Sequence, residues 1–141
     1  MSLAHENLVA WQRADDLFID LHRLTHQRFP RFERFEIGQQ IRRAAWSVPA
    51  NIVEGIARGL GLDSIRFFKI ARGSLSELGY GLHTSKRLGY ITEEEFAVYQ
   101  ARLSAIGGPL QGLINKRRLK VGIKGAGAAM IAFLALAATV L

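Results

Sequence analysis

The chain has 141 residues, enough for one domain with its own hydrophobic core, and a formal net charge of +7. It contains no cysteine, which excludes a disulfide framework and a thiolate metal site. Residues 116–124 hold five basic residues and no acid, so residues 1–115 carry only +2, less than is usual for a dedicated polyanion-binding domain. The first residues show no basic region followed by an apolar run. We therefore expect no signal peptide and a cytoplasmic protein.

The first helix is predicted from about Glu6 to Arg28. Apolar residues recur there at helical spacing, in a main stripe that includes Leu8, Trp11 and Phe18, with a second row of Leu17, Leu21 and Leu24 beside it. The dipeptide Phe29-Pro30 should end this helix, because the residue before a proline avoids the helical conformation.

The second helix is predicted from roughly Glu33 to Arg58, with Gly59 and Gly61 ending it. Pro49 lies in its interior, where a proline removes an amide donor and costs about 3 kcal/mol in an unstrained helix. A bend at Pro49 is acceptable if the freed carbonyl finds another partner.

The third helix should begin at Asp63 and Ser64, which have N-cap side chains, and end at Gly89. The fourth begins at a capping box, Thr92 to Glu95, in which the threonine hydroxyl and the glutamate carboxylate each accept a backbone amide. Pro109 should kink or break this helix.

These elements predict an all-α fold, an up-down antiparallel four-helix bundle formed by residues 1–115, because no alternating strand pattern occurs. A basic junction, residues 116–124, follows the bundle. The last segment, residues 125–141, is apolar and predicts an additional C-terminal helical segment.

Several motifs resemble one bacterial family. The runs QIRRAAWSVPANIVEGIARG and FFKIARGSLSELGYGL, the opening LVAWQRADDLFIDLHRLTHQRFP and the junction LGYIT are similar to S23-like proteins encoded in intervening sequences of large-subunit ribosomal RNA genes. The same fold includes the accessory variability determinant protein of diversity-generating retroelements. The resemblance covers roughly residues 8–115 and implies a ring-shaped homopentamer. In the retroelement branch it also implies binding to nucleic acid and to a reverse transcriptase.

Five polar residues lie beside the apolar stripes of the second and third helices: Ser47, Asn51, Glu54, Ser74 and Glu77. They match recurring polar positions of the family, and we interpret them as an interhelical hydrogen-bond network with Arg43 and Arg58 as partners for the carboxylates. A satisfied network of this kind fixes helix register.

Catalysis and metal binding have little support in the sequence. Glu54 and Glu77 could form an acid–base pair, but no hydrolase, metalloprotease or phosphate-loop motif accompanies them. His22 and His26 are four residues apart and could share a metal ion, yet the sequence offers no third ligand. We expect a protein that is not an enzyme and needs no cofactor.

Basic residues of the second and third helices are the candidates for nucleic-acid contact: Arg42, Arg43, Arg58, Arg66, Lys69, Arg72, Lys86 and Arg87. Repetition around a ring would strengthen such a face. Charge alone favours ordinary solvated residues paired with acids. The family resemblance is what makes RNA or DNA a candidate partner.

The apolar segment 125–141 has to hide its surface in lipid or in protein. Seventeen residues form a helix of about 26 Å, the lower limit for a bilayer core. The basic junction suits a membrane surface, whereas the short length and the many alanines slightly favour burial in the oligomer. Both alternatives use the same contact candidates: Met130, Ile131, Phe133, Leu134 and Leu136.

The leading functional prediction is a ring-forming helical protein that binds or scaffolds nucleic acid, as an accessory to a reverse transcriptase if the chain belongs to the retroelement branch. The alternative is a structural homo-oligomer, tethered to a membrane through its tail, with no nucleic-acid role. Genomic context would separate them, since the first requires a neighbouring reverse transcriptase or an interrupted ribosomal RNA gene.

Overall fold

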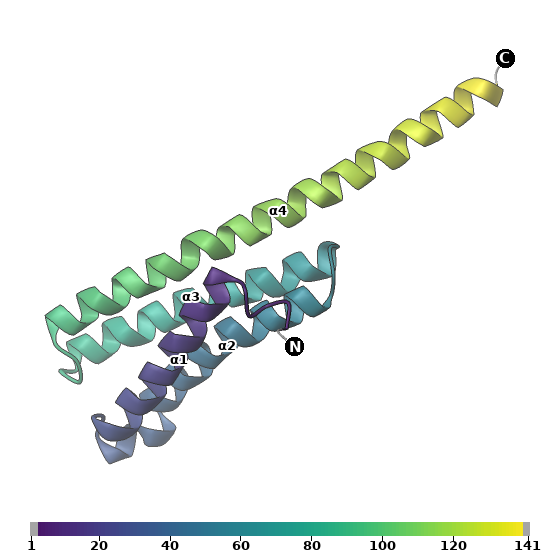
Figure 1. Ribbon diagram of the computed structural model, residues 1–141. Coiled ribbons are helices and arrows are strands. Elements are labelled where there is room, and N and C mark those ends of the chain that lie inside the picture. Colours follow the sequence, from purple (N-terminus) through teal and green to yellow (C-terminus); the bar gives the residue numbers. More distant parts are fainter. Residues whose placement is uncertain (1–2, 140–141) are drawn as a thin grey trace.

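The computed structural model describes residues 3–139, most of which are helical (Figure 1). The elements in chain order are α1 (Val9–Gln27), the 3₁₀ helix η1 (Arg31–Phe35), α2 (Ile37–Ala57), α3 (Leu62–Arg87) and α4 (Glu93–Thr139). Each α-helix packs against the next one along the chain, and α4 also packs against α1, which closes the bundle. No strand occurs in the described residues. The predicted all-α bundle is confirmed.

The core is formed by one apolar face from each α-helix. In α1 this face consists of Ala10, Ala14, Leu17, Leu21 and Leu24, all buried. The predicted main stripe of Leu8, Trp11 and Phe18 lies at the edge of the core and is only partly buried. The two small alanines let α1 approach its neighbours closely, so the row that contains them faces the centre.

The second predicted helix is divided in two. Residues 31–35 form η1, and Glu36, with φ −117° and ψ −114°, separates it from α2. Glu33 explains the break, because its carboxylate accepts the amide of Ile37 at 3.2 Å and the hydroxyl of Tyr90 at 2.7 Å. It is only 6% exposed. A buried carboxylate with two donors is a specific tertiary contact, and the sequence pattern did not predict it.

The ends of the helices follow the predicted glycines. Gly59 and Gly89 adopt φ of +85° and +78°, the left-handed conformation typical of helix C-termini. The capping box of α4 is also confirmed, since the amide of Glu95 donates to Thr92 Oγ1 and the amide of Thr92 donates to Glu95 Oε1, both at 3.1 Å.

Two predictions about helix boundaries are wrong. Gly61, which has no capping side chain, precedes α3, and Ser64 is a fully buried residue inside that helix. Its Oγ accepts Nε of Arg117 at 3.1 Å. The fourth helix continues through Pro109. Pro109 has no amide hydrogen for the carbonyl of Ala105, and Nη1 of Arg13 in α1 donates to that carbonyl at 2.6 Å.

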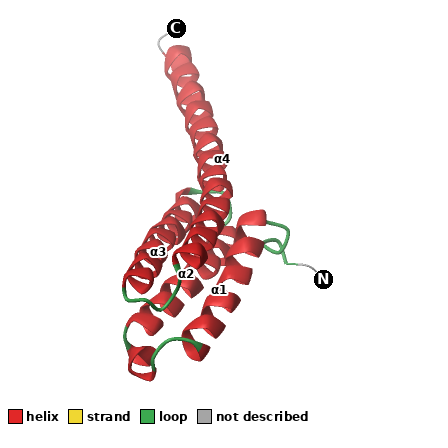
Figure 2. Cartoon of the chain, turned by 90° about the vertical axis from the view of Figure 1, so that its left-hand side faces the viewer, coloured by secondary structure: helices red, strands yellow, loops and turns green. Residues whose placement is uncertain are grey.

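The bundle core ends well before α4 does. Ile114 is the last buried residue of α4 among those described, and the helix then leaves the bundle as a single rod (Figure 2). Arg117 and Val121 still contact the bundle, and the described residues beyond Val121 extend past it.

Candidate functional site

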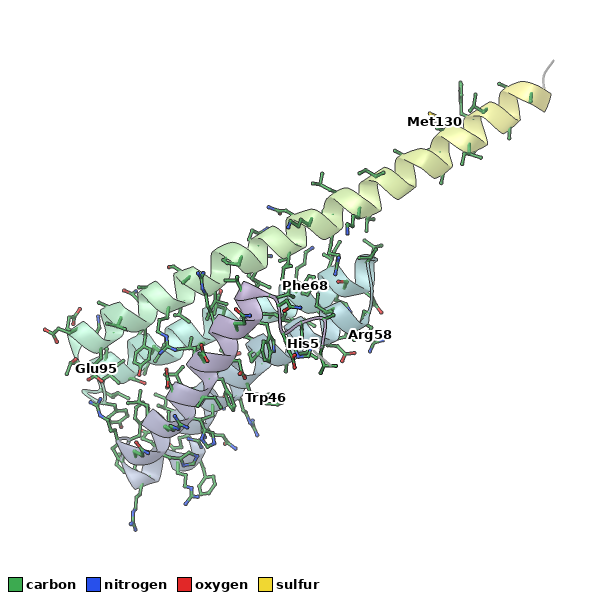
Figure 3. The ribbon with its side chains drawn as sticks, in the orientation of Figure 1. His5, Trp46, Arg58, Phe68, Glu95 and Met130 are labelled. Carbon is green, nitrogen blue, oxygen red and sulfur yellow. The ribbon has the colours of Figure 1, made fainter. Side chains whose placement is uncertain are left out.

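The exposed half of α4 is the most unusual surface of the molecule. Its five large apolar candidates, Met130, Ile131, Phe133, Leu134 and Leu136, are 60–71% exposed, and Met130 lies far from the bundle in Figure 3. Among the described residues, α4 is the one helix long and apolar enough to cross a membrane, judged by length and composition only. Its most apolar 18-residue window has a mean hydropathy of 1.8 and contains no buried residue.

The α2–α3 turn lies at the end of the bundle from which α4 leaves (Figure 1). Arg117 of α4 lies beside the first turns of α3, because it donates a hydrogen bond to Ser64 and lies 5.8 Å from the centre of the Phe68 ring. Arg72 of α3 contacts Gln111 one to two turns further into the bundle.

Nearly all the charge imbalance of the protein lies at this end. Segments 54–72 and 116–124 together hold nine basic and two acidic residues, a net charge of +7. The rest of the chain holds ten basic and ten acidic residues and is formally neutral. We call residues 54–72 and 116–124 the basic end. The sequence alone did not indicate it, because the two segments are far apart along the chain.

The eight basic candidates for nucleic-acid contact do not form one face. Arg58, Arg66, Lys69 and Arg72 belong to the basic end. Lys86 and Arg87 lie at the opposite end, where Lys86 pairs with Glu93 at 3.4 Å and lies 4.5 Å from the ring of Phe96.

Arg42 is held within the structure. It donates to Thr25 Oγ1 at 3.0 Å and to the carbonyl of Arg34 at 2.6 Å. Burial, with a smaller effect of Arg34, lowers the pKa of Arg42. Arg42 is therefore a structural residue that joins α1 to η1 and α2.

Three of the four candidates at the basic end form ion pairs or hydrogen bonds with acidic or amide side chains. Arg58 pairs with Glu54 at 2.8 Å and with Asp63 at 3.8 Å, and Arg66 pairs with Asp63 at 3.8 Å. Arg72 donates to Gln111 at 2.8 Å. Within the described part of the chain, Arg43, Lys69 and Arg87 have exposed side chains without an ion pair or side-chain hydrogen bond.

Three of the five proposed network residues meet between α2 and α3. The hydroxyls of Ser47 and Ser74 are 2.7 Å apart, and Nδ2 of Asn51 donates to Ser47 Oγ at 3.0 Å and to its carbonyl at 2.8 Å. Glu54 is not part of this group and pairs with Arg58, one of the two partners expected for the carboxylates, at the end of α2. Glu77 is exposed and has no ion pair with any described residue, Arg43 included.

Glu54 and Glu77, the candidate acid–base pair, do not lie in a common site. Glu54 is at the level of Phe68 of α3, because its neighbour Gly55 packs against that ring. Glu77 lies nine residues beyond Phe68, which places it about 13 Å from that level along the axis of α3. The rings of His22 and His26 are 4.7 Å apart, but the described residues contain no group of three potential metal ligands. Burial and then Arg42 lower the pKa of His26.

Two further features were not predicted from the sequence. A surface hollow of about 640 Å³ lies between the end of α1 and η1, lined partly by His26, Arg31 and Arg34. The α2–α3 turn carries Leu60 and Leu62, which are 44% and 71% exposed. The sequence predicted a turn here from Gly59 and Gly61, but it did not indicate that both leucines would be exposed.

Comparison with known proteins agrees with this fold. A family model described as 23S rRNA-intervening sequence protein matches residues 6–112. The chain is also similar to the crystal structure of a protein with unknown function from the S23 ribosomal protein family of Bacteroides thetaiotaomicron VPI-5482. The TM-score is 0.69 and the identity 24%, over 75% of this chain and 98% of that one. A comparison with curated proteins gives no match.

The family match ends at residue 112, before the basic junction and the apolar segment begin. The similarity in structure at 24% identity concerns the fold alone. Over its bundle, this chain belongs to the family of 23S rRNA-intervening sequence proteins, as the sequence motifs predicted.

Proposed function

We propose that this protein is a non-enzymatic helical scaffold that α4 holds at the cytoplasmic face of a membrane. One observation carries the proposal: the charge-free end of α4 extends past the bundle with its large apolar side chains 60–71% exposed, and it leaves at the basic end. Loops and junctions rich in lysine and arginine stay on the cytoplasmic side of a bilayer, and anionic headgroups attract them.

The length of the exposed helix suits this role. Residues 122–139, which follow Val121, the last residue packed against the core, form a helix about 27 Å long, close to the roughly 30 Å of a hydrocarbon core. The sequence has one charged residue in this stretch, Lys124, near the end that joins the bundle. Removing five large apolar side chains from water is worth on the order of 10 kcal/mol, so the segment does not favour an aqueous environment.

Deleting residues 125–141 tests the tether. The intact protein should float with phosphatidylcholine vesicles that contain phosphatidylserine, and high salt should not release it. The shortened chain should stay soluble, keep its melting temperature and subunit number, and no longer float. If the tail packs inside an oligomer instead, the deletion changes the melting temperature or the subunit number, and neither form binds vesicles.

Self-association is part of the proposal. The family resemblance suggests a homopentamer, and large exposed side chains support association, among them Trp46 at 59% and Tyr80 at 71% exposure. Light scattering on the shortened chain should show a discrete oligomer. A stable monomer across micromolar concentrations would contradict this part of the proposal.

Nucleic-acid binding is a second candidate function, which the basic end favours. Arg66, Lys69 and Arg72 follow one another at three-residue spacing along α3, so they project over one side of that helix. Replacing all three with glutamine should weaken binding of RNA or DNA and flatten its salt dependence. The comparison belongs in a chain ending at Asn115, which lacks the five basic residues of the junction. Unchanged affinity and salt slope would exclude this face.

A partnership with a reverse transcriptase would follow from the retroelement branch of the family. Its support is the resemblance alone. A reverse-transcriptase gene with variable repeats beside this gene would favour it, and a position inside a ribosomal RNA gene would count against it.

A further inference from the structure

The α2–α3 turn has features that the tether by itself does not require. Gly59, in the left-handed conformation, reverses the chain, and Leu60 and Leu62 point outward at 44% and 71% exposure. We propose that this turn is a second membrane contact, in which both leucines enter the headgroup region of an anionic bilayer beside α4. The inference rests on the proposed tether, since α4 sets the position of the turn relative to the membrane.

The height of the turn along α4 is the first argument. Ser64 is level with Arg117, to which it is hydrogen-bonded. Leu62 precedes Ser64 by two residues in a helix that runs antiparallel to α4, so it lies about 3 Å closer to the membrane end. Val121 packs against the core, so the apolar stretch can start at Gly122 or, past Lys124, at Gly125, and these lie about 8 and 12 Å beyond Arg117. Leu62 is therefore about 5 to 9 Å from the hydrocarbon boundary.

Headgroups occupy that interval. A bilayer of 40–45 Å with a core of about 30 Å has a polar layer of roughly 5–7 Å on each side. Leucine side chains at this depth can reach the boundary of the acyl chains. An interfacial contact, rather than a second crossing, is what two leucines on a short turn can make.

The charges around the turn are the second argument. Asp63 is the acid nearest to the leucines along the chain, and Arg58 and Arg66 both pair with it at 3.8 Å. The two guanidinium groups also lie 5.1 and 4.9 Å from the centre of the Phe67 ring. The turn itself is thus balanced, and the surplus positive charge comes from Lys69, Arg72 and the junction 116–124. Anionic headgroups complement that surplus.

Attachment through α4 makes a weak second contact effective. Once α4 is inserted, the turn stays next to the surface, so its contact is intramolecular and needs little additional ordering. Two contacts also restrict rotation of the bundle about α4. The turn would therefore set which side of the bundle faces the membrane.

The absence of cysteine from the chain allows a direct test with single-cysteine variants of the full-length protein, each labelled with the environment-sensitive fluorophore NBD. Leu62→Cys reports on the turn, and Leu134→Cys reports on the inserted helix. Val98→Cys is the matched control, because Val98 is 60% exposed and lies about 28 Å from Arg117 along α4, toward the opposite end of the bundle. Vesicles of phosphatidylcholine with phosphatidylserine are then added to each.

We expect blue-shifted, brighter emission at positions 134 and 62 and no change at position 98. A response at 134 with none at 62 would overturn the second contact and leave the tether intact. Unchanged emission at both positions would overturn the second contact and the tether. Emission at 62 that is already blue-shifted before vesicles are added, and does not change afterwards, would assign the leucines to a contact between copies of the chain. A response at 98 equal to that at 62 would indicate adsorption of the whole bundle and also contradict the inference.

Discussion

At the scale of single residues, Glu95 has two roles at the start of α4. It completes the capping box with Thr92, and it binds Arg28 of the α1 terminus through both carboxylate oxygens. The guanidinium of Arg28, followed by the backbone amide of Thr92, lowers the pKa of Glu95 to about 2. Because the folded state lowers this pKa, the ionised group stabilises the fold above about pH 4.5, and this stabilisation is lost as the pH falls toward 2.

Glu95→Gln tests that role, since glutamine keeps a capping-box acceptor but removes the charge. We expect the free energy of unfolding at pH 7 to fall by about 1 kcal/mol, allowing for the partial exposure of the pair. The difference from the unmodified protein should shrink as the pH falls below 4.5 and be mostly lost by about pH 2. Glu94→Gln is the control, because Glu94 is exposed and has no ion pair among the described residues. Urea titrations at both pH values would measure the effect, and an equal loss in the control would refute it.

Gly55 is a residue at which close packing requires glycine. A Cβ at this position would lie 2.5 Å from the ring of Phe68, which is fully buried, whereas a Cβ at Gly73 would meet nothing within 4 Å. Gly55→Ala should therefore destabilise the bundle by about 1–3 kcal/mol through overpacking. Gly73→Ala, also within a helix, should stabilise it by about 0.5–1 kcal/mol. Thermal unfolding of the two variants compares them directly, and the same sign of effect in both would contradict this packing.

At the scale of the element, α4 continues through Pro109. Pro109 leaves the carbonyl of Ala105 without its amide donor, and Arg13 of α1 donates a hydrogen bond to that carbonyl. Arg13→Ala should reduce stability by about 1 kcal/mol, since the Ala105 carbonyl then loses its 2.6 Å partner. In a Pro109→Ala background the backbone amide returns, and the same change at Arg13 should have a clearly smaller effect. A double-mutant cycle in urea would give this coupling, which we expect to be at least about 0.5 kcal/mol. Strict additivity would show that Arg13 and Pro109 act independently.

At the scale of the whole molecule, a chain that is otherwise formally neutral carries one strongly positive end. Replacing Lys116, Arg118 and Lys120 with glutamine should weaken partitioning onto anionic vesicles by about 1 kcal/mol per residue at low salt, and affect neutral vesicles little. Arg117 is left in place because it binds Ser64. The control makes the same charge change outside the basic end, at Arg23, Arg31 and Arg43, which are exposed. Equal losses in both triple variants would mean that total charge, rather than its position, governs binding.

Much of the fold could be predicted from neighbouring residues alone. The capping box at Thr92 and the stops at Gly59 and Gly89 were correct because these signals act within four residues of one another. Apolar periodicity also indicated four helices from nearby residues, because the spacing of apolar residues shows which side of each helix is buried. The basic junction and the apolar segment were equally visible as composition.

Contacts between segments far apart in the sequence determined the features that were not predicted. Ser64 became a buried partner of Arg117 instead of a cap, and Glu33 divided a predicted helix by binding Tyr90. Of the eight basic candidates, only the folded chain distinguished those held in pairs from those left exposed. The basic end itself exists because α3 and α4 run antiparallel and bring segments 54–72 and 116–124 to one level. Periodicity assigns a residue to a face of its own helix, whereas its partner depends on how the helices pack against one another.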